Sequence, residues 1–373
     1  MKQIGTILFF FLAFSAQSSE QILSNEAEIY LLTVSPGEAL YSCFGHSALW
    51  VIDKKKNIDV VYNYGTFDFD EENFYLKFIL GNLKYKLAKD NLVDLQWFYG
   101  QEGRAIHAQK INVDAAFKQR IFNRLAYEYQ PENRYYLYDF KSNNCATRIA
   151  DIFYDLHTLS LDSSHFTKDS TFRDLLHVYT RSKPWLSLGI DLILGKPVDE
   201  KVNLRSATFL PDYLSRSLFF LNYNGKSFVM PRSVLLPQKI KPKEVLFWMQ
   251  PWFWICLLFS IGYFLRKKNF GKILYYITYS FLLIFSMLLV FLILFTLHPT
   301  TKWNFNLLWA NPILFLLPIP WKKQRVKLIL IALYLVQVLF YLTGLHGQAV
   351  IFEMLPLVLF TSYFLLERNK KLI

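Results

Sequence analysis

Cysteine is scarce in this chain, with three among 373 residues. Small secreted domains built around disulfides have dense and even-numbered cysteines, so this scarcity excludes a disulfide framework. Cys256 lies in a long apolar run, which leaves Cys43 and Cys145 outside it. A bridge between those two cysteines is the structural alternative to thiol chemistry at either of them.

Several binding signatures are also missing from the sequence. No cysteines and histidines have the spacing of a zinc site, and no glycine-rich loop has the pattern that holds phosphates or dinucleotides. The acidic residues Asp68, Asp70, Glu71 and Glu72 lack the loop spacing of a calcium site and fit a solvated turn. We therefore expect no metal and no cofactor.

Net charge is low in the first two thirds of the chain. The whole chain carries +12, but residues 247–373 contain twelve basic residues against Glu353 and Glu367, a net of +10, so residues 1–246 carry +2. An almost neutral N-terminal part without a nucleic-acid motif makes nucleic-acid binding unexpected. The positive charge belongs to the C-terminal part.

Long hydrophobic runs fill that C-terminal part. Five of them are near the length at which a tilted helix crosses a bilayer, namely 247–265, 273–297, 305–320, 328–344 and 348–366. The first and third connections and the tail hold clusters of basic residues, whereas the second and fourth hold only Lys302 and Glu353. By the positive-inside rule, this alternation predicts five spans embedded in a membrane, with a cytoplasmic C-terminus.

The N-terminus predicts export. Lys2 precedes an apolar stretch, Ile4–Phe14, and small residues at Ala16–Ser18, which is the pattern of a signal peptide. An uncleaved anchor is the alternative, but this stretch is shorter than the ~20 residues that cross a bilayer. We predict a signal peptide over 1–18, an exported domain over 19–236, a linker over 237–246 and a transmembrane domain over 247–373.

The exported part is expected to mix strands and helices, an α+β fold class. Runs rich in aliphatic and β-branched residues, bounded by turn-formers, predict strands over 28–34, 47–52 and 60–64. Alanine, leucine and charge at helical spacing predict helices over 115–129 and 146–156.

Cys145 is predicted to lie in the first turn of the second of these helices. Asn143 and Asn144 are good capping residues, and the stretch 146–156 has one apolar face. The first turn of a helix lowers the pKa of a thiol, and its free backbone N–H groups can hold an oxyanion. Cys145 therefore meets two requirements for acyl transfer through a thioester.

His46 is the candidate base. It opens a predicted strand after Gly45, a small residue that lets another part of the chain approach closely. Its imidazole can take the thiol proton if a polar group orients the other nitrogen, and Asn63 on the next strand is the candidate for that group. A histidine and a cysteine 99 residues apart also occur by chance in many chains, so buried structural residues remain the alternative.

A family resemblance rests on five blocks of sequence: Phe44–Ala48, Tyr62–Thr66, Asn143–Thr147, Trp185 with Gly189–Asp191, and Phe209–Tyr213. Together they resemble the Lnb-type bacterial lipoprotein N-acyltransferases, and the stretch His298–Pro312 resembles that family too. Five blocks in order are much more specific than a single histidine or cysteine.

The resemblance implies a permuted papain-like (NlpC-like) exported domain, in which the histidine strand precedes the cysteine helix, followed by a bundle of about five transmembrane helices. It implies that Cys145 is the nucleophile and His46 the base. Asn63 is carried over as the third polar group, a position that varies among these folds. We expect Asn144 and Tyr64, which lie in the matching blocks, to contact substrate.

The loop His298–Pro312 is a second candidate binding element. Trp303, Asn304 and Asn306 place aromatic and polar groups at the level of the lipid headgroups. Tryptophan is typical of a membrane-interface belt, but a belt does not explain the asparagines. Binding of an acyl chain or headgroup and a purely structural role are both open.

The resemblance also implies a reaction in two steps. A membrane phospholipid acylates Cys145, and the N-terminal amine of a diacylglyceryl-cysteine lipoprotein then accepts the acyl chain. Such an enzyme would lie in the bacterial inner membrane, with its catalytic domain in the periplasm. The alternatives are a membrane-anchored papain-like hydrolase, either a phospholipase or a peptidase, and a tethered binding module with an inactive site.

Overall fold

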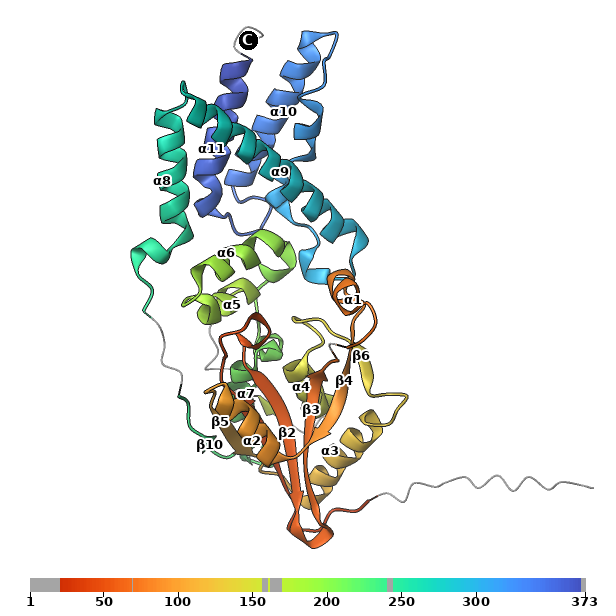
Figure 1. The fold of residues 1–373 in the computed structure, drawn as a ribbon. Coiled ribbons are helices and arrows are strands. Elements are labelled where there is room, and N and C mark those ends of the chain that lie inside the picture. Colours follow the sequence, from red (N-terminus) through yellow and green to blue (C-terminus); the bar gives the residue numbers. More distant parts are fainter. Residues whose placement is uncertain (1–20, 69, 156–159, 162–169, 240–243, 370–373) are drawn as a thin grey trace, which may run out of the picture.

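The computed structural model describes residues 21–68, 70–155, 160–161, 170–239 and 244–369. The predicted signal peptide, 1–18, lies outside these residues. The described chain forms an N-terminal sheet domain and a C-terminal helical region, with a layer of short helices between them (Figure 1).

A seven-stranded antiparallel sheet is the centre of the N-terminal domain. Its spatial order is β10 (Ser233–Leu236), β5 (Ile106–Lys110), β1 (Glu28–Val34), β2 (His46–Asp53), β3 (Ile58–Thr66), β4 (Lys84–Asp90) and β6 (Tyr135–Leu137). The strands predicted over 28–34, 47–52 and 60–64 are confirmed as β1, β2 and β3, which are adjacent. A smaller sheet pairs β7 (Ser160–Leu161), β8 (Leu221–Tyr223) and β9 (Lys226–Ser227).

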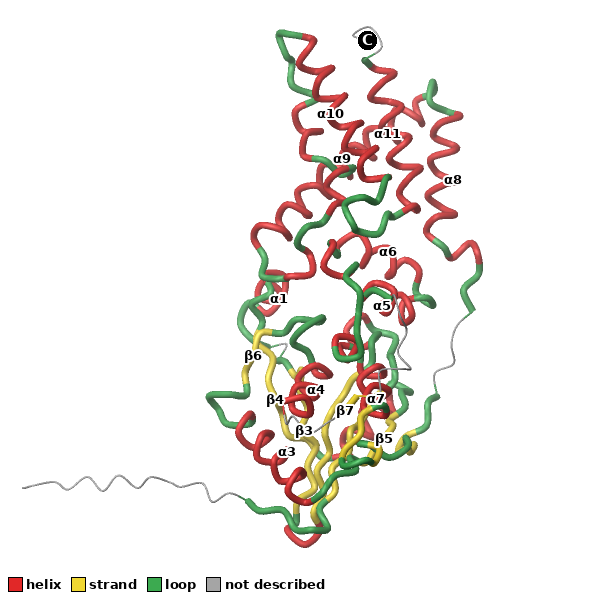
Figure 2. The backbone as a smooth tube through the Cα atoms, turned by 180° about the vertical axis from the view of Figure 1, so that it is seen from behind, coloured by secondary structure: helices red, strands yellow, loops and turns green. Residues whose placement is uncertain are grey.

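Helices cover both faces of the large sheet (Figures 1 and 2). The helix α2 (Leu92–Gln101) packs on one face, and α3 (Ala115–Glu128), α4 (Cys145–Asp155) and α7 (Pro211–Phe219) pack on the other. Because side chains alternate along a strand, the central strands bury apolar residues on both sides. The helices predicted over 115–129 and 146–156 are confirmed as α3 and α4, and the domain mixes strands and helices as expected.

Four long α-helices form the C-terminal region in the described residues: α8 (Pro251–Phe264), α9 (Asn269–Phe295), α10 (Gln324–Leu342) and α11 (Leu355–Arg368). By length and composition, α9 and α10 can cross a membrane. Only 28% of the most apolar stretch of α9 and 22% of that of α10 is buried, so most of this apolar surface faces outward, as lipid contact requires. At 14 residues each, α8 and α11 are shorter than the ~17 residues of the shortest usual spans.

The expected third span, 305–320, is not an α-helix. It forms two short 3-10 turns, Phe305–Leu308 and Pro312–Leu316. The side chains of Asn304 and Asn311 cap these turns, and the second begins at a proline, which has no N–H group for a continuing helix. The prediction of a helix here was wrong because it rested on apolar composition and did not weigh the capping asparagines and the proline, which interrupt a helix.

A layer of short helices joins the two regions: α1 (Phe74–Leu80), α5 (Phe172–Thr180) and α6 (Pro184–Ile193) (Figure 1). Leu188 of α6 is buried in the apolar cluster of the membrane-side helices. At the end of α1, the backbone N–H of Leu297 donates to the Leu80 carbonyl over 2.8 Å. The sheet domain is thus held against the helical region at two places.

Candidate active site

The N-terminus of α4 holds Cys145 in a fixed position. The side-chain oxygen of Asn144 accepts hydrogen bonds from the N–H groups of Ala146 and Thr147, at 2.8 and 3.0 Å, which confirms the predicted cap. Its amide nitrogen donates to two backbone carbonyls, at 2.6 and 2.8 Å. Both polar atoms of Asn144, a residue expected to contact substrate, therefore hold the start of the helix and the loops around it.

His46 is the first residue of β2 and lies within hydrogen-bonding reach of Cys145. Its Nε2 and the side-chain oxygen of Asn63 on β3 are 2.6 Å apart, which leaves Nδ1 for the thiol. Gly45, immediately before His46, has a φ of +83°, a conformation that favours glycine. The structure brings together all three residues predicted to act in catalysis.

Asp90, which no sequence motif indicated, extends this line of contacts. It ends β4, and its carboxylate accepts a hydrogen bond from the Asn63 amide nitrogen over 2.7 Å. This bond directs the oxygen of Asn63 toward His46, because the two ends of an amide are a donor and an acceptor. A strand predicted over 84–90, paired antiparallel with β3, would have placed Asp90 near Asn63, but no such strand was predicted.

Cys145 and His46 influence each other's ionisation. Burial disfavours a charged sulfur, but the His46 charge, its hydrogen bond and the N–H groups of Ser47 and Ala146 together lower the pKa of Cys145. Burial also disfavours a charged imidazole, yet Cys145 and Asn63 outweigh it and raise the pKa of His46. A thiolate beside an imidazolium is the state that these opposite shifts favour, and a thiolate is the reactive nucleophile.

Cys145 faces a small cavity of about 50 Å³. Its walls are mostly apolar and include Tyr41, Phe44, Tyr138, Phe140, Leu176 and Phe209. A water needs ~10–15 Å³ of such space, so a reacting carbonyl fits the cavity and a whole acyl chain does not. Tyr41 is 65% exposed and lies at the open side, where a longer chain can continue.

Two tyrosines near the site differ in what they can do. Tyr64, expected to contact substrate, is buried in the core, where its hydroxyl donates to Glu128 over 2.8 Å. Tyr136 is also buried, but among the described residues nothing accepts a hydrogen bond from its hydroxyl. Gly65 lies between this hydroxyl and Cys145, since a Cβ built on it would be 3.6 Å from the Cys145 Cβ and 3.9 Å from the Tyr136 hydroxyl oxygen. Burial raises the pKa of Tyr136, so its hydroxyl keeps its proton.

The loop 298–312 contacts α6. The side-chain nitrogens of Asn304 and Asn306 donate to the carbonyl oxygens of residues 191–193 at the end of α6, over 2.8–3.2 Å. The last carbonyls of a helix have no partner within the helix, so these asparagines satisfy them. Trp303, in contrast, is 73% exposed. The asparagines thus have the structural role that the sequence left open, and Trp303 is available to lipid.

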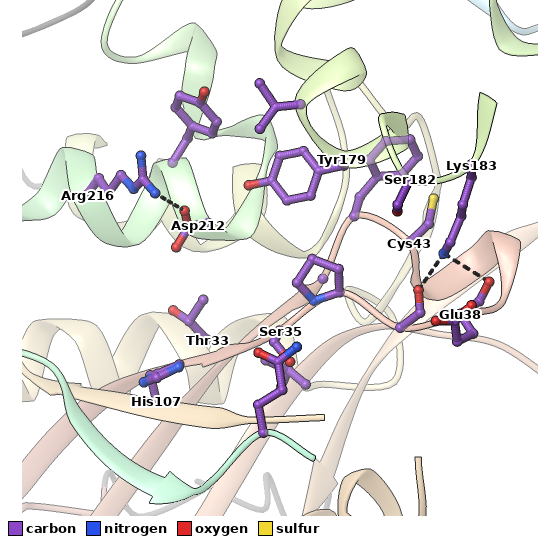
Figure 3. Close-up of a pocket in the computed structure, with 18 of the residues that line it drawn as sticks. Thr33, Ser35, Glu38, Cys43, His107, Tyr179, Ser182, Lys183, Asp212 and Arg216 are labelled. Atoms are coloured by element: carbon purple, nitrogen blue, oxygen red, sulfur yellow. Dashed lines mark hydrogen bonds and ion pairs between the residues drawn. The ribbon is translucent and has the colours of Figure 1, made fainter. Parts of the chain in front are cut away.

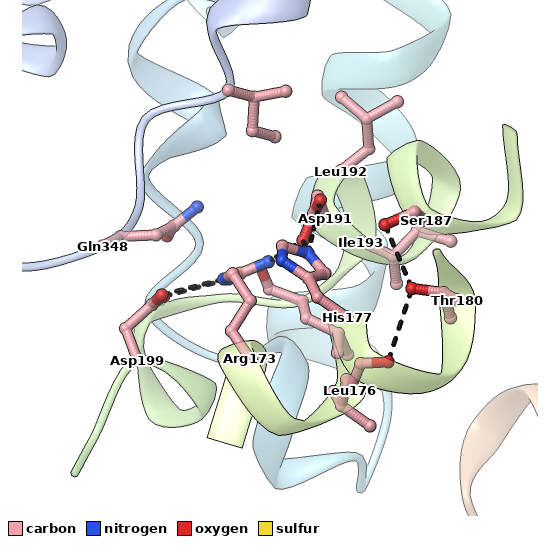
Figure 4. Close-up of polar contacts among 12 residues, drawn as sticks. Arg173, Leu176, His177, Thr180, Ser187, Asp191, Leu192, Ile193, Asp199 and Gln348 are labelled. Carbon is pink, nitrogen blue, oxygen red and sulfur yellow. Dashed lines mark hydrogen bonds and ion pairs between the residues drawn. The ribbon is translucent and has the colours of Figure 1, made fainter. Parts of the chain in front are cut away.

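An ionic network joins α6 to α5 (Figure 4). Arg173 on α5 is buried, and its guanidinium contacts Asp191 at 2.6 Å and Asp199 at 2.8 Å. His177 contacts Asp191 at 2.9 Å, and that carboxylate raises the pKa of His177. Leu176, which lies between Arg173 and His177 on α5, lines the cavity at Cys145. The network therefore connects the membrane-side loop to one wall of the candidate site.

Two family models match this chain. The Lnb N-terminal periplasmic domain matches residues 13–178, and the Lnb transmembrane domain matches residues 241–366. The chain belongs to the Lnb family. No curated protein and no solved structure matches the chain.

Membership of the Lnb family identifies an inner-membrane protein with a periplasmic N-terminal domain, and it suggests an enzyme of lipoprotein N-acylation. Cys145, His46 and Asn63 all lie within the part that matches the Lnb periplasmic domain, and Trp303 lies within the part that matches the Lnb transmembrane domain. The resemblance read from the sequence is confirmed. The exact borders of the domains stay predictions.

Proposed function

We propose that this Lnb-family protein transfers an acyl chain from a membrane phospholipid, through a thioester on Cys145, to the N-terminal amine of diacylglyceryl-cysteine lipoproteins. The observation that carries the proposal is the pairing of Cys145 with His46, whose other nitrogen binds Asn63 at 2.6 Å, in a chain with Lnb periplasmic and transmembrane domains. A histidine strand before a cysteine helix also supports a permuted papain-like fold for the domain.

In the first step, the Cys145 thiolate attacks an ester carbonyl of the phospholipid. The bond from the carbonyl carbon to sulfur forms, and the bond to the glycerol oxygen breaks. The departing oxygen takes the proton of the His46 imidazolium and leaves as the hydroxyl of a lysophospholipid. Cys145 then carries the acyl chain as a thioester, beside a neutral His46.

In the second step, the lipoprotein amine attacks the thioester carbonyl. Neutral His46 accepts the proton that the nitrogen loses, and the sulfur leaves as a thiolate. The products are an N-acylated lipoprotein and the original thiolate–imidazolium pair. The mostly apolar walls of the cavity support transfer to an amine over hydrolysis, because they offer a water few hydrogen-bond partners.

Both steps place negative charge on a carbonyl oxygen. The N–H groups of Ser47 and Ala146 point at the Cys145 sulfur, and the oxygen would form on the carbon bonded to that sulfur, beside these donors. We assign the Tyr136 hydroxyl as a further donor, because it is buried, protonated and gives its hydrogen to no described residue. Donors fixed in place before the reaction stabilise such an oxyanion strongly.

The topology completes the proposal. The charges in the connections support five passes through the membrane, the third of them made by the two short turns of 305–320, which pack among the helices, with the tail after 366 in the cytoplasm and 19–236 in the periplasm. Both proposed substrates are lipids of the membrane, and the exposed Tyr41, beside the cavity at Cys145, and Trp303 are aromatic residues that can meet them.

Mass spectrometry of lipoprotein N-terminal peptides tests this function in cells that lack their own N-acyltransferase activity. We expect the wild-type protein to restore an N-linked acyl group and Cys145→Ala to fail. Cys43→Ala is the matched control and should restore it, because burial raises the pKa of Cys43 to about 11 and keeps that thiol neutral. If Cys145→Ala restores the N-linked acyl group, Cys145 is not the nucleophile. Failure of the normally expressed wild type would favour the hydrolase.

A further inference from the structure

A second and larger cavity lies beside the candidate active site (Figure 3). It measures about 450 Å³, within the ~300–1,000 Å³ typical of ligand clefts. Phe44 and Gly45, the residues just before His46, line both cavities. Among the described residues, none from the membrane-side helices lines the larger one.

The charges around this cavity do not suit a lipid. Lys183, Arg216, Arg232, Glu38 and Asp212 line it beside apolar side chains such as Val34 and Val178, and an acyl chain in the cavity would desolvate these charged groups without giving them hydrogen bonds. Asp212 pairs with Arg216 at 2.8 Å and with Arg232 at 2.7 Å. A phosphate headgroup would therefore compete with a carboxylate for both arginines. The mixture of donors and acceptors matches a neutral ligand with many polar groups.

Thr33 indicates that a polar ligand belongs here. It lines the cavity and is only 4% exposed, yet its hydroxyl has no hydrogen-bond partner among the described residues (Figure 3). Buried hydroxyl groups without partners are rare in native proteins. The oxygen itself is shielded from the cavity, so a turn of the Thr33 side chain would let a ligand with a backbone-like amide or carbonyl supply the missing bond.

We propose that this cavity binds the polypeptide of the acceptor, the residues that follow its lipidated cysteine. The inference rests on the proposed function, which puts the acceptor amine at Cys145. A chain leaving that point can cross the wall at Phe44 and Gly45 into the larger cavity. There its backbone N–H and C=O groups meet the Thr33 hydroxyl and the Asp212–Arg216 pair.

Binding of two fluorescent probes to the full-length protein in detergent tests this inference. One probe is a synthetic diacylglyceryl-cysteine pentapeptide and the other is diacylglyceryl-cysteine amide, which has no further residues. All measurements use a Cys145→Ala background, so no turnover is needed. We expect Thr33→Val and Arg216→Gln to weaken binding of the pentapeptide about fivefold or more, in the range of one lost hydrogen bond, and to leave the amide unchanged.

Two control variants separate this effect from misfolding. Thr33→Ser keeps the hydroxyl and should bind like the parent. Arg205→Gln removes another exposed arginine that pairs with an aspartate at 2.8 Å, but outside the cavity, and should also bind like the parent. Photo-cross-linking from the third residue of the pentapeptide should label the segments around Thr33 or Asp212.

Equal binding of the pentapeptide by all variants, or equal losses for both probes, would overturn the inference. Unchanged pentapeptide binding with slower release of lysophospholipid, measured with Cys145 restored, would assign the cavity to the donor headgroup instead. Because binding is measured without turnover, failure of the acyl transfer itself would leave these outcomes readable.

Discussion

The ionisation of the Cys145 sulfur depends on residues from three other elements. His46 opens β2, Asn63 lies on β3 and Asp90 ends β4, and their contacts form one line from the sulfur outward. A neutral Cys145 thiol would be a weak nucleophile, so the line of contacts determines reactivity as well as position.

The pH dependence of Cys145 alkylation checks this pairing. The lowered pKa of Cys145 and the raised pKa of His46 predict that iodoacetamide reacts with Cys145 at pH values below the ordinary thiol pKa of about 8.5. Acyl transfer should rise with pH as the thiolate forms and fall as pH passes the pKa of His46, because the imidazolium proton is lost there.

Asn63→Ala should narrow the range of pH over which acyl transfer is fast. Its hydrogen bond raises the pKa of His46, so its loss should move the alkaline limb to lower pH and bring the Cys145 pKa back up. We also expect a rate loss of up to about 100-fold from misplacement of the imidazole. Asp59→Asn, at the other end of β3, is the control and should change neither. If the alkaline limb of the pH profile does not move in Asn63→Ala, Asn63 does not raise the pKa of His46.

At the scale of residues, the sequence indicated which side chains could react but not which hydrogen-bond partners surround them. Cys145, His46 and Asn63 were predictable because capping residues, strand starts and family blocks mark them. Asp90 and Tyr136 were not, because pairings between strands that are distant in sequence bring each of them near Cys145. Asn144 and Tyr64 were expected at the substrate, but the sequence could not show that their polar atoms already have protein partners.

At the scale of elements, α6 is the link between the membrane-side helices and the periplasmic domain. Asn304 and Asn306 hold its last carbonyls, and Asp191 joins it to Arg173 on α5. Neither contact can be read from local sequence, because each joins segments far apart in the chain. Loop composition therefore left lipid binding and a structural role both open, whereas the structure shows a helix end held by asparagines.

Asn304→Ala and Asn306→Ala should each destabilise this junction. Each removes donors from buried carbonyls, at a cost of about 1–3 kcal/mol. The expected result is a lower Tm and faster proteolysis near α6 in the detergent-solubilised protein. Asn82→Ala, on an exposed surface, is the control. An unchanged Tm with weaker binding of lipid would instead return these asparagines to a substrate role.

At the scale of the whole molecule, charge and hydropathy predicted a periplasmic domain followed by membrane helices, which the family matches confirm. They predicted the number of helices less well, since 305–320 folds as two short turns. Hydropathy reports the solvent around a segment, whereas prolines and capping side chains decide whether that segment continues as a helix.

Reporter fusions test the orientation of the membrane part. A fluorescent protein that folds only in the cytoplasm, fused after residue 366, should fluoresce, and alkaline phosphatase at the same place should be inactive. The opposite pattern is expected for fusions in the connection that contains Trp303. Active phosphatase at the C-terminus would contradict the cytoplasmic tail and an odd number of spans.

Intact-protein mass spectrometry of the purified protein tests the thioester itself. The protein is incubated with a phospholipid of one defined acyl chain and no acceptor. We predict that the wild type and Cys43→Ala gain one acyl chain, that neutral hydroxylamine removes it, and that peptide mapping places it on Cys145. The absence of an adduct on wild type, or an adduct that persists in Cys145→Ala, would contradict the account.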